Sequence, residues 1–366
     1  MNNVTLLDQL LEYSCRELQL SPTNHGIADQ RYHSVGEWLA AEGSPLQQLK
    51  PIIYPQGSFC IGTTVYPLGR NEHDLDFVCE MAVDYQRMPA LDMLNAVEQR
   101  LRAHTTYASM VERKKRCIRL NYAGKFHMDI LPAAPEVFRH GTEVRVPDRK
   151  LEQWTSSNPK GYAEWFKQRS HVVDEKLLSE ADIEPLTPHQ SVEEKAPLQL
   201  VVQLMKRARD RYFINDPDNA PRSIVLTTLA GLVYQGQSST AQAIHDVLGA
   251  INEMATPLGL VVRNPANNQE VLSEQWLIGS AYGRFRQWMQ WFFAEWNKVL
   301  IPRGIQETER QLSTLFGEDL VSAALRKQVS DVEFLRKSGK LNIARSGLIT
   351  AAPGILNVRP NTFYGD

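Results

Sequence analysis

Two short apolar segments of the sequence carry aspartates at positions that a β-strand would turn to one face. In the first segment Asp74 and Asp76 alternate with apolar residues. In the second, Asp129 stands between Met128 and Ile130. Because alternate side chains of a strand point to opposite faces, the pattern predicts two strands of a half-buried sheet with three carboxylates on one side.

Three carboxylates on one sheet face constrain the chemistry of that face. Such groups repel one another and raise one another's pKa values unless divalent cations lie among them. Mg²⁺, a hard ion that prefers oxygen ligands, is the expected occupant. Two such ions, about 4 Å apart, stabilise the attacking and leaving oxygens of an in-line displacement. The acids therefore predict a metal-dependent phosphoryl-transfer site that uses a nucleoside triphosphate.

A Gly57-Ser58 step precedes the paired acids. Glycine lets backbone N–H groups approach a phosphate closely, and the serine hydroxyl adds a further donor. A Gly-Ser step alone is usually only a turn, and an isolated Asp-x-Asp pair is usually a solvated strand end. Their ordered combination favours a phosphate-binding catalytic site.

A known superfamily combines a Gly-Ser turn, a strand with paired acids and a third acid on a later strand. This sequence carries them in QGSFCIGTTVYP, HDLDFVCEM and FHMDILPA. It thereby resembles the DNA polymerase beta-like nucleotidyltransferases. NPKGYAEWF and LQLVVQLMKRARDRYF narrow the resemblance to the bacterial cGAS/DncV-like nucleotidyltransferases, over most of residues 50–235. One departure is a longer interval before Asp74, where Pro67, Gly69 and Asn71 predict an inserted turn.

The resemblance implies an α+β fold in which a polymerase beta-like core, a mixed sheet with flanking helices, packs on a helical C-terminal lobe. It implies that Asp74 and Asp76 hold two Mg²⁺ ions, for which Mn²⁺ can substitute. Asp129 would help to bind one metal and would position or deprotonate the acceptor ribose hydroxyl. Gly57 and Ser58 would hold the donor triphosphate.

Three later residues receive a role from the resemblance as well. Lys206 and Arg209 lie toward the end of a predicted helix, and Ser223 lies on the next one. The resemblance implies that Lys206 and Arg209 contact the donor triphosphate, with Ser223 nearby. The alternative is that both cations only complement the helix C-terminus.

The function implied is an enzyme that joins ATP, with GTP or other nucleoside triphosphates as further substrates, into a cyclic di- or trinucleotide. Pyrophosphate would leave, and the product would act in anti-phage (CBASS-type) signalling. Two alternatives stay open: a nucleotidyltransferase that adds a single nucleotide to a protein or tRNA, and a non-catalytic nucleotide sensor. A regulatory protein that contacts the C-terminal tail is a further expectation.

Composition and charge narrow the class of protein. The 366 residues exceed one typical core, so a bilobed unit is expected. No apolar run approaches the roughly 20 residues that span a bilayer, and the N-terminus lacks a secretion signal, so we expect a cytoplasmic protein without a membrane partner. A net charge of −2 argues against a general nucleic-acid coat. A basic run is interpreted first as the solvated end of a helix and hairpin, with a site for nucleic acid or an acidic partner as the alternative. That run contains Arg113, Lys114, Lys115, Arg116 and Arg119.

The hydrophobic pattern predicts the order of the elements. Two helices, over 4–18 and 25–49, precede the strands, and a hairpin over 117–131 turns at 123–125. Beyond residue 158 the pattern becomes helical. Helices are predicted over 90–101, 161–169, 196–213, 223–234, 239–254 and 275–298. The predicted domains are a catalytic lobe (1–157), a helical lobe (158–338) and an extended tail (339–366).

Aromatic residues could stack on a nucleobase in the predicted cleft. The sequence does not select among the candidates, which are Tyr54, Trp165, Tyr212, Phe213 and Tyr234. The aromatic run between Trp288 and Trp296 has helical spacing and is expected in the core of the helical lobe.

Overall fold

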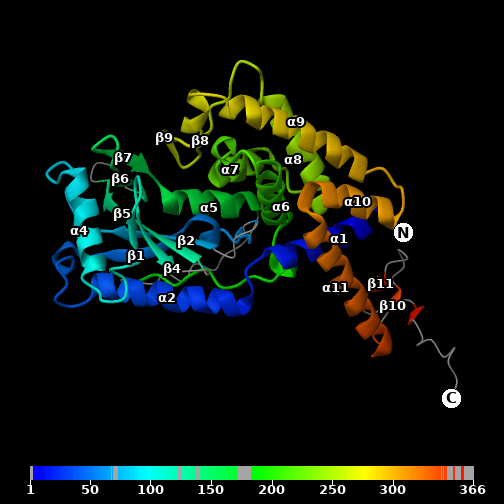
Figure 1. The fold of residues 1–366 in the computed structure, drawn as a ribbon, viewed down its shortest axis with the longest axis horizontal. Helices are drawn as coiled ribbons and strands as arrows, with labels where there is room; N and C mark the ends of the chain where they lie inside the picture. The colour runs from blue at the N-terminus through cyan, green and yellow to red at the C-terminus, as the bar shows by residue number, and fades with distance from the viewer. Residues whose placement is uncertain are drawn as a thin grey trace.

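The chain forms a mixed β-sheet joined to a bundle of helices (Figure 1). This computed structural model describes residues 3–66, 68, 73–122, 126–136, 141–170, 183–338, 340, 342–343, 349–350 and 356–357. The predicted α+β class and its helical second part are confirmed.

The sheet runs in the order β1-β2-β5-β4-β3, with β6 paired to β5 and β7 paired to β6. Among the described strands of this sheet, β2 and β5 pair in parallel, and the other neighbouring strands pair antiparallel. The strands are β1 (Ile52–Gln56), β2 (His73–Glu80), β3 (Val111–Arg113), β4 (Ile118–Tyr122), β5 (Phe126–Pro135), β6 (Val144–Asp148) and β7 (Gln153–Ser157).

One face of the sheet is covered by α2 (Pro22–Ala40) and α4 (Ala90–Arg102), which flank the strands in Figure 1. Leu75, Phe77 and Met128 on that face are fully buried and pack in one apolar cluster with both helices. Burial of this face leaves the opposite side of β2 and β5 for polar side chains.

The second apolar core lies in the helical part. Its helices are α5 (Pro159–Ser170), α6 (Pro197–Tyr212), α7 (Ser223–Val233), α8 (Thr240–Met254), α9 (Ala281–Val299), α10 (Ile305–Phe316) and α11 (Glu318–Lys337). Trp288, Phe292 and Trp296 of α9 are fully buried there, as predicted.

The first helix, α1 (Asn3–Leu18), also packs in the helical core. Its buried Leu7, Leu10 and Leu11 belong to that cluster, and the Tyr13 hydroxyl donates a hydrogen bond to Asp331 of α11 (3.2 Å). The chain therefore starts in the helical part and enters the sheet only afterwards, at α2.

Most helices lie within two residues of the predicted limits, and two predictions were wrong, one at both ends and one at its start. The helix expected over 25–49 starts at the Ser21 cap and ends at Ala40, before Gly43 with its φ of +77°. The helix expected from residue 275 begins at Ala281, because Gly279 adopts a φ of +80°. A positive φ interrupts a right-handed helix.

Several elements were not predicted. They are β1, the short helix α3 (Gly57–Cys60), β3, α10, α11, β6, β7 and the hairpin of β8 (Arg263–Asn264) and β9 (Asn267–Val271). In the tail, β10 (Asn342–Ile343), β11 (Ile349–Thr350) and β12 (Leu356–Asn357) form a small sheet in the order β11-β10-β12. The expected turns at 67–71 and 123–125, apart from residue 68, and most of the tail lie outside the described residues.

Two further features bear on the expected setting of the protein. Among the described helices, none has the length and apolar character needed to cross a bilayer. All four cysteines are free thiols.

Candidate active site

The parallel pairing of β2 and β5 brings the predicted acids together. Asp76 lies directly beside Asp129, and Asp74 lies beside His127. Neighbours in register share a face of the sheet, so all three carboxylates lie opposite the buried Leu75 and Met128. The common acidic face expected from the sequence is present.

Asp129 is held by an arginine on the other neighbouring strand. Arg119 of β4 lies opposite it in the antiparallel register. Its Nε donates to Oδ1 and its Nη2 to Oδ2, both at 2.7 Å. The same Nη2 lies 3.7 Å from Oδ1 of Asp74. A two-bond pair of this kind restrains the orientation of both side chains.

Asp76 experiences the strongest electrostatic perturbation of the three acids. Burial, together with the negative charges of Asp129 and Asp74, raises its pKa to about 8. No described residue donates a hydrogen bond to its carboxylate. Desolvation by the surrounding protein also raises the pKa of Asp74, which Arg119 opposes, although 64% of that side chain is exposed. Arg119 therefore compensates only part of the negative charge of the acidic face.

The donor set suits a hard divalent cation in part. Asp74 and Asp76 have oxygens available, whereas both oxygens of Asp129 are occupied by Arg119. Within the described part of the chain, no three acidic, histidine or cysteine side chains gather closely enough to surround one metal ion. Mg²⁺ commonly takes only one or two carboxylates and completes its shell with water and substrate phosphate. Asp74 and Asp76 fit that pattern, and Asp129 fits once Arg119 releases it.

The Gly-Ser turn lies against Asp76. Gly57 starts α3 (Gly57–Cys60) with a φ of +65°. A Cβ atom at this position would lie 2.5 Å from Oδ2 of Asp76, so only glycine permits this approach. The adjacent Ser58 accepts a hydrogen bond from the Thr64 hydroxyl (3.3 Å) and lines the same cleft as Asp76.

Lys206 of α6 is almost fully buried behind this turn. Its Nζ donates to the carbonyl oxygen (2.8 Å) and hydroxyl (3.1 Å) of Thr63. Burial, aided by the charge of Arg209, lowers its pKa to about 7. Arg209 itself donates to the Ser223 hydroxyl (2.8 Å). Lys206 and Ser223 line the cleft, while Arg209 lies behind Ser223.

The buried lysine gives a pH-dependent prediction for stability. In the unfolded chain Lys206 binds a proton below pH 10.5, but in the folded protein only below about pH 7. Between these limits the unfolded state holds more protons, so the unfolding free energy should rise with pH, by up to about 1.4 kcal/mol per pH unit. Denaturant unfolding of wild type and Lys206→Met across this range should show the slope only in wild type. Parallel profiles would rule out a depressed pKa.

A cleft of about 360 Å³ lies over the acidic face. Two sets of residues with polar groups stand out in its lining, and no hydrogen bond joins the described side chains of one set to those of the other. The first set contains Gly57, Ser58, Asp74, Asp76 and Lys206, and the second contains Ser157, Asn264 and Glu270. Apolar walls come from several elements, with Tyr162 of α5 as the aromatic residue among the described lining.

The second polar set and Tyr162 were not predicted from the sequence. None of the five aromatic residues proposed as base-stacking candidates is among the described residues that line the cleft. Tyr54 is buried under Glu80, and Tyr212 and Phe213 pack on tryptophans of α9. Tyr162 lies within the NPKGYAEWF run, which was the available signal.

The basic run at 113–119 does not form an unpaired patch. Arg113 pairs with Glu98, and Lys114 with Glu112. Lys115 and Arg116 both lie 3.0 Å from Asp148. With Arg119 on Asp129, every cation of the run has an acidic partner in the protein's own fold.

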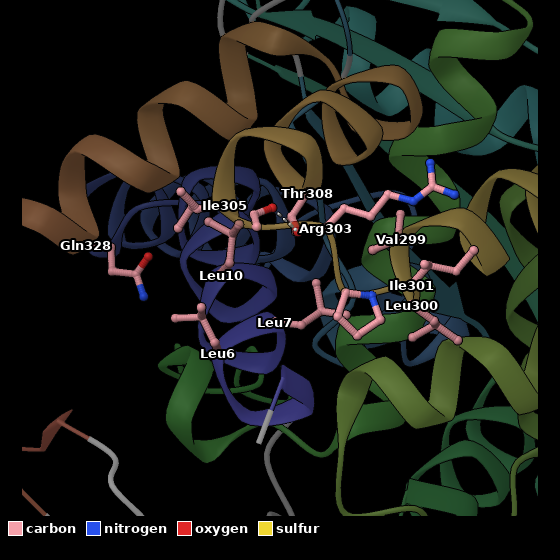
Figure 2. Close-up of a pocket in the computed structure, with 12 residues that line it drawn as sticks. Leu6, Leu7, Leu10, Val299, Leu300, Ile301, Arg303, Ile305, Thr308 and Gln328 are labelled. Carbon is pink, nitrogen blue, oxygen red and sulfur yellow. Dashed lines mark hydrogen bonds between the residues drawn. The ribbon is translucent and has the colours of Figure 1, made fainter. Parts of the chain in front are cut away.

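A second hollow, of about 110 Å³, has a different character (Figure 2). It lies between α1 and the α9–α10 connection, and side chains such as Leu6, Leu10 and Ile305 surround it. Arg303 lines it, but no acidic residue does among the described lining. It therefore offers no carboxylate to a metal ion, in contrast to the cleft over the sheet.

Comparison with known proteins agrees with the site. Residues 5–170 match the family model described as the Second Messenger Oligonucleotide or Dinucleotide Synthetase domain. A c-di-GMP synthase from Roseivirga ehrenbergii is 32% identical over 100% of this chain and 99% of its own length. The chain belongs to the bacterial cGAS/DncV-like nucleotidyltransferases. The resemblance seen in the sequence motifs and the predicted enzyme class are thus confirmed.

Two further matches come from Bradyrhizobium diazoefficiens. Its cyclic dinucleotide synthase CdnG is 28% identical over 74% of this chain and 70% of its own length. The structure of the CD-NTase CdnG in complex with GTP superposes with a TM-score of 0.72 at 23% identity, covering 88% of this chain and 99% of that one. This bacterial nucleotidyltransferase therefore shares its fold with CdnG.

Proposed function

We propose that this nucleotidyltransferase condenses two molecules of GTP into cyclic di-GMP and releases two pyrophosphates. The observation that carries the proposal is the parallel register that sets Asp76 beside Asp129, with Gly57 in contact with Asp76. GTP takes precedence over ATP, the first substrate predicted from the sequence, because the relative that spans the whole chain is named a c-di-GMP synthase.

The chemistry that the site supports is an in-line displacement. The acceptor ribose oxygen forms a bond to the α-phosphorus of the donor GTP, and the bond from that phosphorus to the pyrophosphate oxygen breaks. Asp129, beside Asp76 on the sheet, receives the hydroxyl proton once its carboxylate leaves Arg119. A second, equivalent step closes the ring.

The phosphate groups would lie near the Gly-Ser turn. The Ser58 hydroxyl and the backbone of the turn supply donors at the cleft surface. Lys206 positions the turn through Thr63 and, below about pH 7, places a cation close to it. Mg²⁺ or Mn²⁺ ions, held by Asp74 and Asp76, would neutralise charge on the phosphates and on the leaving pyrophosphate.

A product assay tests the proposal. The purified protein is incubated with Mg²⁺ or Mn²⁺ and either GTP alone, ATP alone or all four ribonucleotides, then treated with phosphatase and analysed by mass spectrometry. We expect GTP alone to yield cyclic di-GMP. This product should survive the phosphatase, because a cyclic dinucleotide has no terminal phosphate to remove. A linear product, a product made only from ATP, or labelling of an added tRNA or protein would refute it.

The biological setting extends the same proposal. The product would serve as a cytoplasmic second messenger in anti-phage (CBASS-type) signalling, and a regulatory protein would contact the tail at 339–366. Phage plaque counts on cells that express the wild-type protein or its Asp76→Asn form address the first point, and fewer plaques are expected with the wild type alone. Pull-down with and without residues 339–366 addresses the second.

A further inference from the structure

A carboxylate from a distant hairpin lies in the cleft, apart from the acids on the sheet. Glu270 of β9 lines the cleft that also contains Asp74 and Asp76. We propose that Glu270 accepts a hydrogen bond from the N1–H or the 2-amino group of guanine and so selects guanine over adenine. The inference rests on the proposed function, since it assigns base specificity to the same cleft.

The position of Glu270 is set by contacts that do not involve the phosphate end of the cleft. The β8–β9 hairpin packs on β7, near α5 in Figure 1. Two buried amides fasten it: Asn158 donates to the carbonyl oxygen of Ala266 (3.0 Å), and Asn267 donates to the Ser156 hydroxyl (2.7 Å). The hairpin therefore presents Glu270 to the cleft from a rigid support.

The carboxylate of Glu270 is held in one orientation but keeps capacity to accept. Asn264 donates to Oε2 (2.7 Å), and the Ser157 hydroxyl lies 3.1 and 3.2 Å from the two oxygens. One hydroxyl has one proton, so these two distances represent a single bond. The backbone N–H of Asn158 is a third donor. An ionised carboxylate has about four acceptor positions, which leaves about one for a ligand.

The chemistry of the two purines decides which ligand suits that position. Guanine presents N1–H and its 2-amino group, and both donate. At the same place adenine presents the N1 lone pair and C2–H. A carboxylate with no proton repels the N1 lone pair of adenine, so one acid both favours guanine and rejects adenine. Burial raises the pKa of Glu270, and its donors and the charge of Arg116 oppose that rise.

The alternative role for Glu270 is to fasten β9 to β7 and α5 without any contact to the base. The two roles differ in what they do to adenine nucleotides. Loss of a structural support would lower the affinities for ATP and GTP equally. Loss of a contact to the base would change the ratio of the two affinities. The nucleotide preference therefore separates the two roles.

The experiment compares wild type, Glu270→Gln and a control, Glu253→Gln, on the exposed face of α8. Affinity for GTP, ATP and ITP, which lacks the 2-amino group, is measured by calorimetry in Ca²⁺, with cyclic product measured in parallel in Mg²⁺. Glu270→Gln should lower GTP affinity and its kcat/KM about 10- to 100-fold with ATP unchanged or improved. Glu253→Gln should match wild type. A wild-type preference for GTP over ITP that Glu270→Gln abolishes identifies the 2-amino group as partner, and equal losses for both identify N1–H.

Equal losses for GTP and ATP in Glu270→Gln, or unchanged GTP affinity, would overturn the inference. If Glu270→Gln does not fold, the ratio of GTP to ATP affinity is measured for Glu270→Asp instead. Aspartate keeps the negative charge but is one methylene shorter, so its carboxylate lies farther from the base. The product assay tests the proposed function, and the binding assay tests this inference, so each can be refuted without the other. Absence of cyclic di-GMP from a wild type that prefers GTP refutes the proposed function alone, whereas a wild type with no preference for GTP refutes this inference alone.

Discussion

Asp76→Asn is expected to lower cyclic dinucleotide synthesis by about 1,000-fold or more. Asp76 is half-buried, lies beside Asp129 and lies against the Gly-Ser turn. The asparagine amide has the shape of the carboxylate but lacks the negative charge that binds a divalent cation. Losses of this size are typical when one electrostatic group of an active site is removed. Initial rates of pyrophosphate release and of product formation, with Asp218→Asn on the surface as control, measure the effect.

The same substitution should not unfold the protein. The folded pKa of Asp76, about 8, lies above its unfolded value of 3.8, so the folded state binds this proton more tightly. Its ionisation therefore destabilises the metal-free protein progressively between about pH 4 and pH 8, and asparagine removes that cost. The Tm of Asp76→Asn relative to wild type, in EDTA, should rise across this range. Normal activity, or a Tm difference that falls with pH, would contradict the assignment.

Gly57→Ala is expected to reduce turnover about 100-fold or more and to lower stability. The new methyl group would lie 2.5 Å from Oδ2 of Asp76, so the turn or the carboxylate has to move. The φ of +65° adds about 1 kcal/mol for any residue with a Cβ. Turnover is measured from initial rates, and stability from denaturant unfolding.

Gly43→Ala is the matched control for this experiment. Gly43 has a similar φ of +77°, but a Cβ atom there would meet nothing within 4 Å. It should lose about 1 kcal/mol of stability and keep full activity. The extra stability loss of Gly57→Ala should shrink in an Asp76→Ala background, because the contact partner is gone. Equal behaviour of both alanine variants would show that the contact with Asp76 does not matter.

The acidic face could be predicted from the sequence because it depends only on alternation along a strand. Residues 74–77 and 128–130 alternate clearly, and the structure buries the apolar partners as expected. The contact between Arg119 and Asp129 was also within reach. Both residues lie five positions from 124, the centre of the predicted turn, so the hairpin places them opposite each other. This pairing was not predicted, because Arg119 was assigned to the basic run at 113–119.

Other parts of the site could not be predicted because they depend on long-range packing. Glu270 reaches the cleft through the β8–β9 hairpin, which has no strong hydrophobic period and docks on β7 more than a hundred residues earlier in the chain. The parallel pairing of β2 with β5 likewise joins strands that are separated by α4. Local patterns predict which face a residue occupies, but they do not predict which distant segment approaches that face.

The position of α1 has a consequence for how the protein is made. Its apolar face packs among helices of the second core, and Tyr13 bonds to a residue 318 positions later. While the ribosome is still extending the chain, the nascent α1 has no native surface to cover its leucines, whereas α2 can already dock on the completed sheet. The last helices to emerge therefore complete the structure, and premature termination before α11 would leave the part of α1 that packs on α11 uncovered for chaperones to bind.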